Sequence, residues 1–157
     1  MKKIKIVLTD VDGCLTDATV LYTSTGKKIK KFCIYDGMAV TILKEKDILS
    51  GIISSDNSLA TRKRAEDLNM NFIYVGEKNK VDILNEVAKI SNVSLNEIAY
   101  MGDDIQDIDV LSKVGFSACP SNAIEDVKKI VNYITKKQGG AGAYREFVEY
   151  IIRMEGE

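Results

Sequence analysis

Short apolar runs alternate along this chain with longer segments whose apolar residues recur at helical spacing. The runs that predict β-strands are 4–10, 49–54, 72–75, 98–103, 115–119 and 131–135. The segments that predict helices are 36–47, 58–69, 80–90, 107–114, 123–130 and 143–154. Strands and helices that alternate in this way form a parallel sheet with helices on both faces. The sequence therefore predicts an α/β fold with a doubly wound, Rossmann-like parallel sheet.

One segment interrupts this alternation. Residues 19–35 contain two β-rich runs around a Ser-Thr-Gly turn, which predicts a β-hairpin. The basic run at 27–32 alternates with Ile29, a pattern typical of the solvent-facing side of a strand. Because the chain has 157 residues and no linker or repeat, we expect a single domain, 1–157, with the hairpin as an insert at about 18–35.

The composition excludes several classes of function. The 22 basic and 23 acidic residues nearly cancel, so the chain has no electrostatic footprint for nucleic acid. No stretch approaches the roughly 18 apolar residues of a membrane span, and the N-terminus is not expected to be a signal peptide. The three cysteines have no Cys-x-x-Cys spacing and are interpreted as free thiols of a cytoplasmic protein. Because histidine is absent, Ser-His-Asp and Cys-His catalysis are excluded.

Three carboxylates follow the first predicted strand, and this arrangement is energetically unfavourable by itself. Asp10 and Asp12 come directly after the apolar run, and Asp17 lies a few residues beyond. Two carboxylates about 4 Å apart repel each other by roughly 4 kcal/mol at an effective dielectric constant of about 20. A bound cation, or a reaction that uses these charges, would offset the repulsion.

The second, third and fourth predicted strands lead to residues suited to the same task. Ser54 ends the second, Lys80 follows the third, and Asp103, Asp104 and Asp107 follow the fourth. The carboxyl ends of parallel strands meet at one edge of the sheet. There the carboxylates would form an oxygen-rich site for Mg²⁺, while the hydroxyl and the lysine would bind phosphate oxygens. Each piece alone is common on protein surfaces, so the prediction depends on their order along the chain.

Four motifs make the sequence resemble a known family. "DVDGCLTD", "IISSDNS", "GEKNK" and "MGDDIQD" look like the four motifs of the haloacid dehalogenase-like hydrolases. The resemblance is closer still to the small capless branch that contains 3-deoxy-manno-octulosonate 8-phosphate phosphatase. It covers nearly the whole chain, including residues 139–146. The resemblance implies that this Gly-rich tail reaches the active site of its own or a neighbouring subunit. Without the resemblance, the stretch 136–143 is expected to be a flexible joint before the last helix.

The resemblance implies a phosphatase mechanism. Asp10 would attack phosphorus and form an aspartyl phosphate, while Asp12 would protonate the leaving alcohol and then activate water. Asp10, the backbone carbonyl of Asp12, and Asp103 would hold Mg²⁺. Phosphate monoesters hydrolyse extremely slowly unaided, and a carboxylate nucleophile divides the reaction into two easier steps.

The same resemblance assigns supporting roles to other residues of these motifs. Ser54 and Lys80 would bind the phosphoryl oxygens, and Gly13, Asp104 and Asp107 would surround and support the reacting groups. Positive charge from Mg²⁺ and Lys80 would stabilise the phosphoryl transition state.

Two residues bear on the substrate, which the resemblance implies is the phosphate of a 2-keto-3-deoxy sugar acid. Arg64 matches a position that binds the sugar-acid carboxylate in the resembling branch, a group suited to a bidentate donor. Asp56 stands where phosphatases of eight-carbon octulosonate 8-phosphate usually have Arg, and where the nine-carbon branch tends to have an acid. Asp67 departs in turn from the nine-carbon branch, which tends to have Lys. The sequence slightly favours a nine-carbon KDN or sialic acid 9-phosphate over octulosonate 8-phosphate.

The hairpin occupies the place of the cap domain that is usual in this superfamily. In the resembling branch it joins subunits into a tetramer, which implies a homotetramer here. The apolar edge formed by Val20, Leu21 and Tyr22 supports this, because such an edge promotes association. An ordinary hairpin on a monomer is the alternative.

Two other functions fit parts of the pattern. A receiver-like signalling domain also combines acids, a hydroxyl and a lysine on a doubly wound sheet, but its acid pair lies on adjacent residues. A catalytically silent assembly module of the same fold would not need its catalytic residues, but here all four are intact: Asp10, Asp12, Lys80 and Asp103. A Mg²⁺-dependent assay with an aryl phosphate separates the three hypotheses.

We expect Asp10→Asn to abolish turnover and leave the fold intact, because an amide has the shape of a carboxylate but cannot act as the nucleophile. The measurement is Mg²⁺-dependent hydrolysis of an aryl phosphate, with circular dichroism as the control for folding. Substantial residual activity in the folded variant would contradict the assignment. Asp12→Asn should lower turnover by about 10²–10⁴-fold, the usual contribution of acid–base catalysis.

Overall fold

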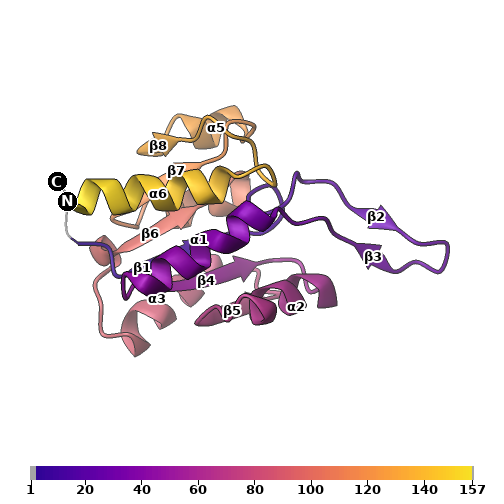
Figure 1. Ribbon diagram of the computed structural model, residues 1–157, viewed down its shortest axis with the longest axis horizontal. Coiled ribbons are helices and arrows are strands. Elements are labelled where there is room, and N and C mark those ends of the chain that lie inside the picture. Colours follow the sequence, from indigo (N-terminus) through magenta and orange to yellow (C-terminus); the bar gives the residue numbers. More distant parts are fainter. Residues whose placement is uncertain (1–2, 157) are drawn as a thin grey trace.

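The computed structural model describes residues 3–156 and contains a six-stranded sheet in which all pairs are parallel (Figure 1). Its strands are β1 (Ile6–Thr9), β4 (Leu49–Ser54), β5 (Phe72–Val75), β6 (Ile98–Met101), β7 (Phe116–Cys119) and β8 (Tyr133–Ile134). They lie in the order β5-β4-β1-β6-β7-β8. After β5 the chain returns to the far side of β1, so the switch point between the two halves lies between β1 and β6. Open α/β sheets bind ligands at such a point, and the predicted fold class is confirmed.

Helices cover both faces of this sheet. One face carries α1 (Ile34–Glu45), α2 (Leu59–Asp67) and α6 (Ala143–Gly156), and the other carries α3 (Lys80–Ile90), α4 (Ile108–Leu111) and α5 (Glu125–Lys128). The alternation of side chains along β1 supplies both cores, because Val7 packs with the first group of helices while Ile6 and Leu8 pack with the second. Two 3₁₀ turns, η1 (Leu95–Glu97) and η2 (Ile105–Asp107), flank β6. No helix within residues 3–156 is long and apolar enough to cross a membrane.

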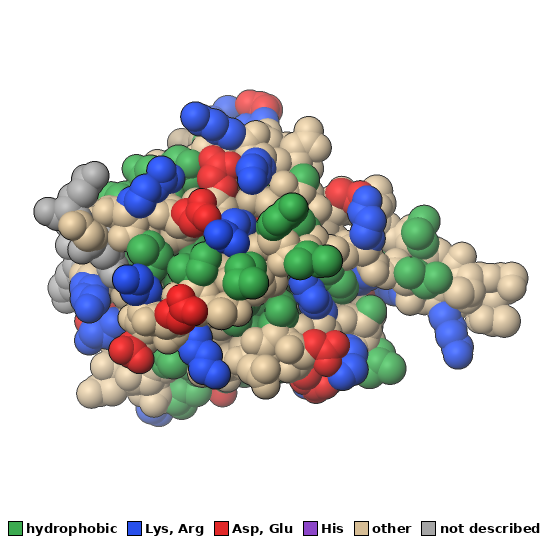
Figure 2. Space-filling view, viewed as in Figure 1, with side chains coloured by type: hydrophobic (Ala, Val, Ile, Leu, Met, Phe, Trp, Pro, Cys, Tyr) green, Lys and Arg blue, Asp and Glu red, His purple; other side chains and the backbone are tan. Residues whose placement is uncertain are grey.

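The predicted hairpin is present and extends away from the body of the molecule (Figure 1). It consists of β2 (Leu21–Tyr22) and β3 (Lys28–Ile29), which pair antiparallel. Leu21 and Tyr22 are 60% and 61% exposed. Hydrophobic side chains are visible on the protruding hairpin in Figure 2.

The Gly-rich stretch before α6 is packed against the body, so the expectation of a flexible joint is wrong. The N–H of Gly140 donates to the carbonyl of Cys14 at 3.1 Å, and a Cβ at Gly139 would lie 1.8 Å from the carbonyl oxygen of Gly13. Only glycine permits this approach. The segment therefore closes over the loop that follows β1.

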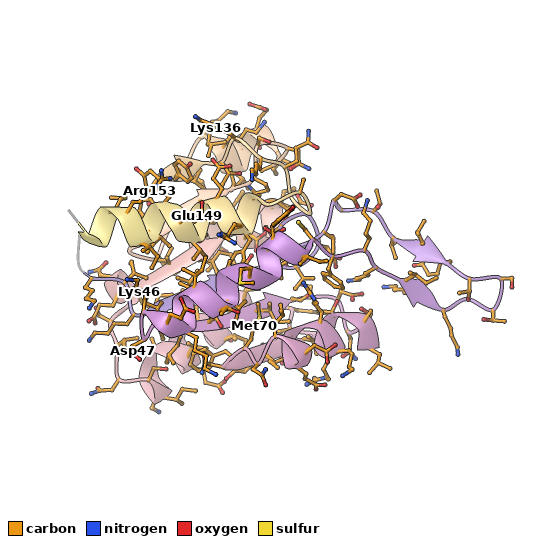
Figure 3. All side chains as sticks on the ribbon, viewed as in Figure 1. Lys46, Asp47, Met70, Lys136, Glu149 and Arg153 are labelled. Carbon is orange, nitrogen blue, oxygen red and sulfur yellow. The ribbon has the colours of Figure 1, made fainter. Side chains whose placement is uncertain are left out.

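The last helix belongs to the core. Tyr144, Phe147, Val148 and Ile151 are fully buried and pack with α1 and the sheet. Buried Asp36, in the first turn of α1, accepts hydrogen bonds from the N–H groups at the start of α6. The exposed residues Glu149 and Arg153 lie on the outer side of α6 (Figure 3).

We expect Phe147→Ala to lower the free energy of unfolding by about 3–5 kcal/mol, the usual loss for a fully buried aromatic side chain. The matched control is Met154→Ala on the exposed side of α6, which should change it by less than about 0.5 kcal/mol. Urea denaturation measures both. A loss below about 1 kcal/mol for Phe147→Ala would mean that α6 is not part of the core.

Candidate active site

The register of the central strands brings the predicted residues to one edge of the sheet. Thr9, at the end of β1, lies between Ile52 of β4 and Met101 of β6. The next residue, Asp10, donates its backbone N–H to the carbonyl of Met101 at 2.9 Å. Its side chain, in a residue only 8% exposed, accepts a hydrogen bond from the N–H of Val11 at 2.7 Å.

Lys80 is the buried cation of the site. It begins α3, and its Nζ lies 3.0 Å from Oδ2 of Asp10 and 2.8 Å from Oδ1 of Asp107. Burial alone would lower the pKa of Lys80, but the charges of Asp10 and Asp107 outweigh this and raise it. The ammonium group therefore stays charged and fixes the distance between the two carboxylates.

Asp107 is fully buried and has both carboxylate oxygens engaged. Oδ1 accepts hydrogen bonds from Lys80 and from the hydroxyl of Tyr100, both at 2.8 Å. Oδ2 accepts from the N–H of Asp103 at 3.0 Å and from that of Asp104 at 3.4 Å. Asp107 thus holds the turn after β6 in place. Tyr100 was missed by the sequence reasoning, because a tyrosine inside an apolar strand shows no sign of a polar role.

Asp103 has far fewer partners. Within the described residues, the thiol of Cys14, at 3.9 Å, is the only hydrogen-bond partner of its carboxylate. Burial, followed by the charges of Asp10 and Asp107, raises the pKa of Asp103 to about 8. Gly13 makes room for this side chain, because a Cβ there would lie 1.8 Å from Oδ2 of Asp103.

The acidic groups have the composition of a site for a divalent cation. Oxygens of Asp10, Asp103 and Asp107 lie within 4.8 Å of one another. Burial and the charge of Asp107 raise the pKa of Asp10 to about 7, against the opposing effect of Lys80. One ammonium group thus faces three carboxylates. Oxygen ligands of this kind suit Mg²⁺. The carboxylate of Asp103 has the fewest partners of the three, so a bound cation would compensate its charge most.

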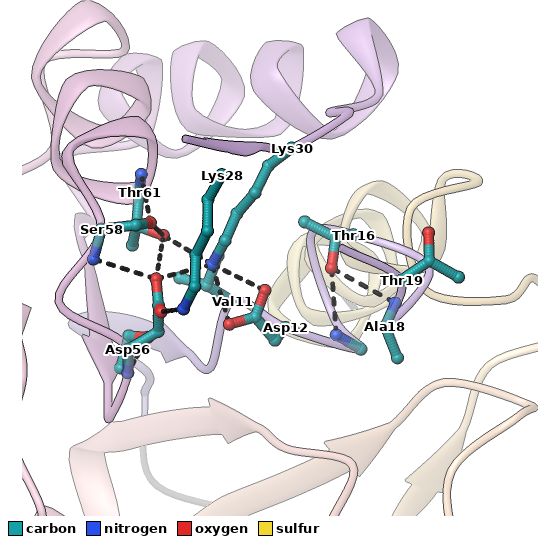
Figure 4. A network of polar contacts seen from close by, with 12 residues as sticks. Val11, Asp12, Thr16, Ala18, Thr19, Lys28, Lys30, Asp56, Ser58 and Thr61 are labelled. Atoms are coloured by element: carbon teal, nitrogen blue, oxygen red, sulfur yellow. Dashed lines mark hydrogen bonds and ion pairs between the residues drawn. The ribbon is translucent and has the colours of Figure 1, made fainter. Parts of the chain in front are cut away.

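Lys30 joins Asp12 to the rest of the site, a role that the sequence reasoning missed. Its Nζ lies 2.8 and 2.9 Å from the two oxygens of Asp12 and 2.8 Å from Oδ2 of Asp56 (Figure 4). The Lys30 side chain is only 2% exposed, so the expectation that the basic run faces solvent is wrong for this residue. The alternating pattern of residues 27–32 could have indicated this role, because Lys28 and Lys30 lie two residues apart and therefore share one face of the strand.

Asp56 has its charge compensated by the same lysines. Lys28 lies 2.7 Å from Oδ1, and Lys30 contacts Oδ2. Burial would raise the pKa of Asp56, but the hydrogen bonds from Lys28 and Lys30 hold it well below its usual range. The repulsion that a bare carboxylate would exert on anionic ligands is therefore offset.

The other predicted residues come from the end of β4, the turn after β6 and α2. Ser54 is buried at the end of β4, where its hydroxyl accepts the N–H of Asp56 at 3.2 Å. The exposed Asp104 caps η2. Arg64, on α2, contacts the segment before α1: its guanidinium donates to the carbonyl of Cys33 at 3.3 Å and lies 5.6 Å from the ring centroid of Phe32.

Comparison with known proteins agrees with this geometry. A model of the haloacid dehalogenase-like hydrolase family matches residues 20–147. A 3-deoxy-D-manno-octulosonate 8-phosphate phosphatase of Haemophilus influenzae is 32% identical over 157 residues, covering all of this chain and 87% of the relative. The chain belongs to the haloacid dehalogenase-like hydrolases, and it is an enzyme of the phosphatase class.

Solved structures of such phosphatases have the same fold. That of Moraxella catarrhalis, in complex with magnesium, phosphate and KDO, is 35% identical with a TM-score of 0.93, over 96% of this chain and 86% of the other. The cobalt-bound enzyme of Haemophilus influenzae is 33% identical with a TM-score of 0.94, over 98% and 90% of the two chains.

We expect Asp103→Asn to stabilise the metal-free protein at pH 8. Since the pKa of folded Asp103 is raised to about 8, the folded state retains a proton that the unfolded state releases near pH 4, so stability falls as the pH rises between these values. The amide removes this penalty, and the variant should unfold at a higher temperature than wild type at pH 8, with a smaller difference at pH 5.

Thermal unfolding in a chelating buffer at both pH values measures this effect. Asp109→Asn, the same change on an exposed aspartate of α4, is the control and should leave the unfolding temperature close to that of wild type at both pH values. If the unfolding temperatures of Asp103→Asn and wild type differ by the same amount at pH 5 and pH 8, the uncompensated charge does not lie on Asp103.

Proposed function

We propose that this protein is a Mg²⁺-dependent phosphatase that hydrolyses the phosphate monoester of a 2-keto-3-deoxy sugar acid, with 3-deoxy-D-manno-octulosonate 8-phosphate as the favoured substrate. The reaction is inferred from the position of Asp10, which pairs with Lys80 and lies beside Asp103 at the switch point of the sheet. The choice of sugar acid is supported by relatives that match nearly the whole chain and whose names specify this substrate.

In the proposed mechanism, a carboxylate oxygen of Asp10 attacks phosphorus, and the bond to the leaving alcohol breaks. Asp12 gives its proton to that alcohol, and an aspartyl phosphate remains on Asp10. Asp12 then takes a proton from water, which attacks the phosphoryl group and releases inorganic phosphate. Lys80 and the hydroxyl of Ser54 bind the phosphoryl oxygens in both steps, and their positions at neighbouring strand ends support this role.

The residues that would hold Mg²⁺ are Asp10, Asp103 and the backbone carbonyl of Asp12. The bound ion would supply positive charge to the phosphoryl oxygens. Gly13, Asp104 and Asp107 would support the ligands: Gly13 leaves space for Asp103, and Asp107 fixes the backbone that carries it.

The sugar acid would occupy the space beside the hairpin. A surface cavity of about 820 Å³ lies there, and its lining includes Lys28, Asp56, Ser58 and Lys63. Lysines in this lining suit an anionic sugar acid, while Asp56 would accept hydrogen bonds from sugar hydroxyls. Asp56 itself favours the second candidate, a nine-carbon 9-phosphate. Arg64 would bind the carboxylate only after its guanidinium leaves the carbonyl of Cys33.

We also propose a homotetramer in the cytoplasm, in which one domain, 1–157, carries the hairpin into a subunit contact. The exposed apolar side chains of the hairpin support this assembly, since Val20, Leu21 and Ile29 are each more than two-fifths exposed. Association would remove this apolar surface from water.

We expect wild-type kcat/KM to be at least about tenfold higher for octulosonate 8-phosphate than for a nine-carbon 9-phosphate, which corresponds to about 1.4 kcal/mol. Asp56→Arg should increase this ratio further if position 56 sets the choice. Glu66→Arg, the same charge change at another exposed residue of α2, is the control and should leave the ratio unchanged.

A tenfold preference for the nine-carbon substrate would select the second candidate and leave the phosphatase mechanism standing. If neither compound is hydrolysed while an aryl phosphate is, the proposed class of substrate is wrong.

A further inference from the structure

The ammonium group of Lys30 is surrounded by acceptors on the body of the molecule. It contacts both oxygens of Asp12, Oδ2 of Asp56 at 2.8 Å and the hydroxyl of Thr61 at 2.9 Å. Figure 4 shows the side chain reaching between Asp12 and Asp56. Lys30 lies just after β3, at the base of the hairpin, so a residue of the hairpin insert holds a side chain of the acidic motif.

This environment argues against a direct contact between Lys30 and the substrate. An ammonium group has three protons, and here four acceptor atoms lie within hydrogen-bond distance of it. These acceptors exceed the three protons, so a ligand would have to displace one of them to bind Lys30. Lys28 differs, since its side chain is 39% exposed and Asp56 is its only ion-pair partner among residues 3–156.

Asp12 depends on Lys30 for its position. The Asp12 side chain is 40% exposed, and Lys30 supplies the only hydrogen bonds to its carboxylate among the described residues. An exposed aspartate without this partner would be free to rotate away from Asp10. A proton donor must lie within hydrogen-bond reach of the atom that it protonates, so loss of position lowers the rate of proton transfer.

We infer that Lys30 is the positioning residue for Asp12, and that the hairpin thereby holds the general acid in place over the nucleophile. The inference rests on the proposed function, because it assigns to Lys30 the placement of the proton donor in that reaction. It adds a second role to the hairpin, distinct from contact between subunits. It also explains why a nearly inaccessible lysine is part of an otherwise exposed basic run.

The test compares two aryl phosphates that differ in how much they need an acid. p-Nitrophenolate leaves readily without a proton, whereas phenol needs one more strongly. The kcat/KM value reports the steps up to departure of this group, so a misplaced acid should affect phenyl phosphate selectively. For Lys30→Met we expect a decrease of about 100-fold with phenyl phosphate. The decrease with p-nitrophenyl phosphate should be less than about fivefold.

Two variants serve as controls. Lys31→Met removes the neighbouring lysine, whose side chain is 77% exposed, and should change neither value. Lys28→Met removes the other lysine on Asp56 and should leave the ratio between the two substrates unchanged. Lys30→Arg retains charge and donors, so its selective loss with phenyl phosphate should be smaller than that of Lys30→Met. If Lys30→Met does not fold, the same comparison is made with Lys30→Arg alone.

The outcomes separate this inference from the proposed function. If wild type hydrolyses neither aryl phosphate, the phosphatase proposal fails. If wild type hydrolyses both and Asp12→Asn loses phenyl phosphate selectively, but folded Lys30 variants lose both substrates equally or neither, the inference about Lys30 is overturned and the proposed mechanism stands. An equal loss would indicate that Lys30 merely stabilises the structure.

Discussion

The contact between one buried ammonium group and two carboxylates is the constraint on which the site depends. The Nζ of Lys80 lies 3.0 Å from Asp10 and 2.8 Å from Asp107, and the residue is buried. Removing one partner of a buried ion pair leaves an uncompensated charge, so these three residues must be placed together. Asp10 follows β1, Lys80 begins α3 and Asp107 ends η2, and the parallel register of β1 and β6 brings these segments to one edge.

Charge is balanced differently in the two parts of the site. In the outer part, Lys28 and Lys30 compensate Asp56, and Lys30 also pairs with Asp12. In the inner part, Lys80 is insufficient for the carboxylates around it, and the pKa of Asp103 is raised to about 8 by burial and by its acidic neighbours. Such a deficit of positive charge is destabilising alone but suits a site that binds a divalent cation and a phosphate ester.

The sequence predicted the alternating α/β fold, the hairpin, and the meeting of Asp10, Lys80 and Asp103 at one sheet edge, because strand periodicity and strand ends are local signals. It did not predict contacts that depend on packing between distant segments. From the sequence, Lys30 was interpreted as a surface lysine, because its contact with Asp12 depends on how the base of the hairpin packs. The glycines before α6 were interpreted as a flexible joint, because their packing against the carbonyl of Gly13 is likewise a contact between distant segments. The neighbours of a side chain, rather than its type, decide such roles.

Asp103 completes a cation site in which Lys80 alone does not balance the negative charge. Calorimetric titration of the metal-free protein with Mg²⁺ tests this directly, with Asp103→Asn and the exposed Asp109→Asn as a matched pair. We expect one Mg²⁺ bound per chain in wild type and in Asp109→Asn, and loss of this binding in Asp103→Asn. Equal Mg²⁺ binding by wild type and Asp103→Asn, or no binding by wild type, would contradict it.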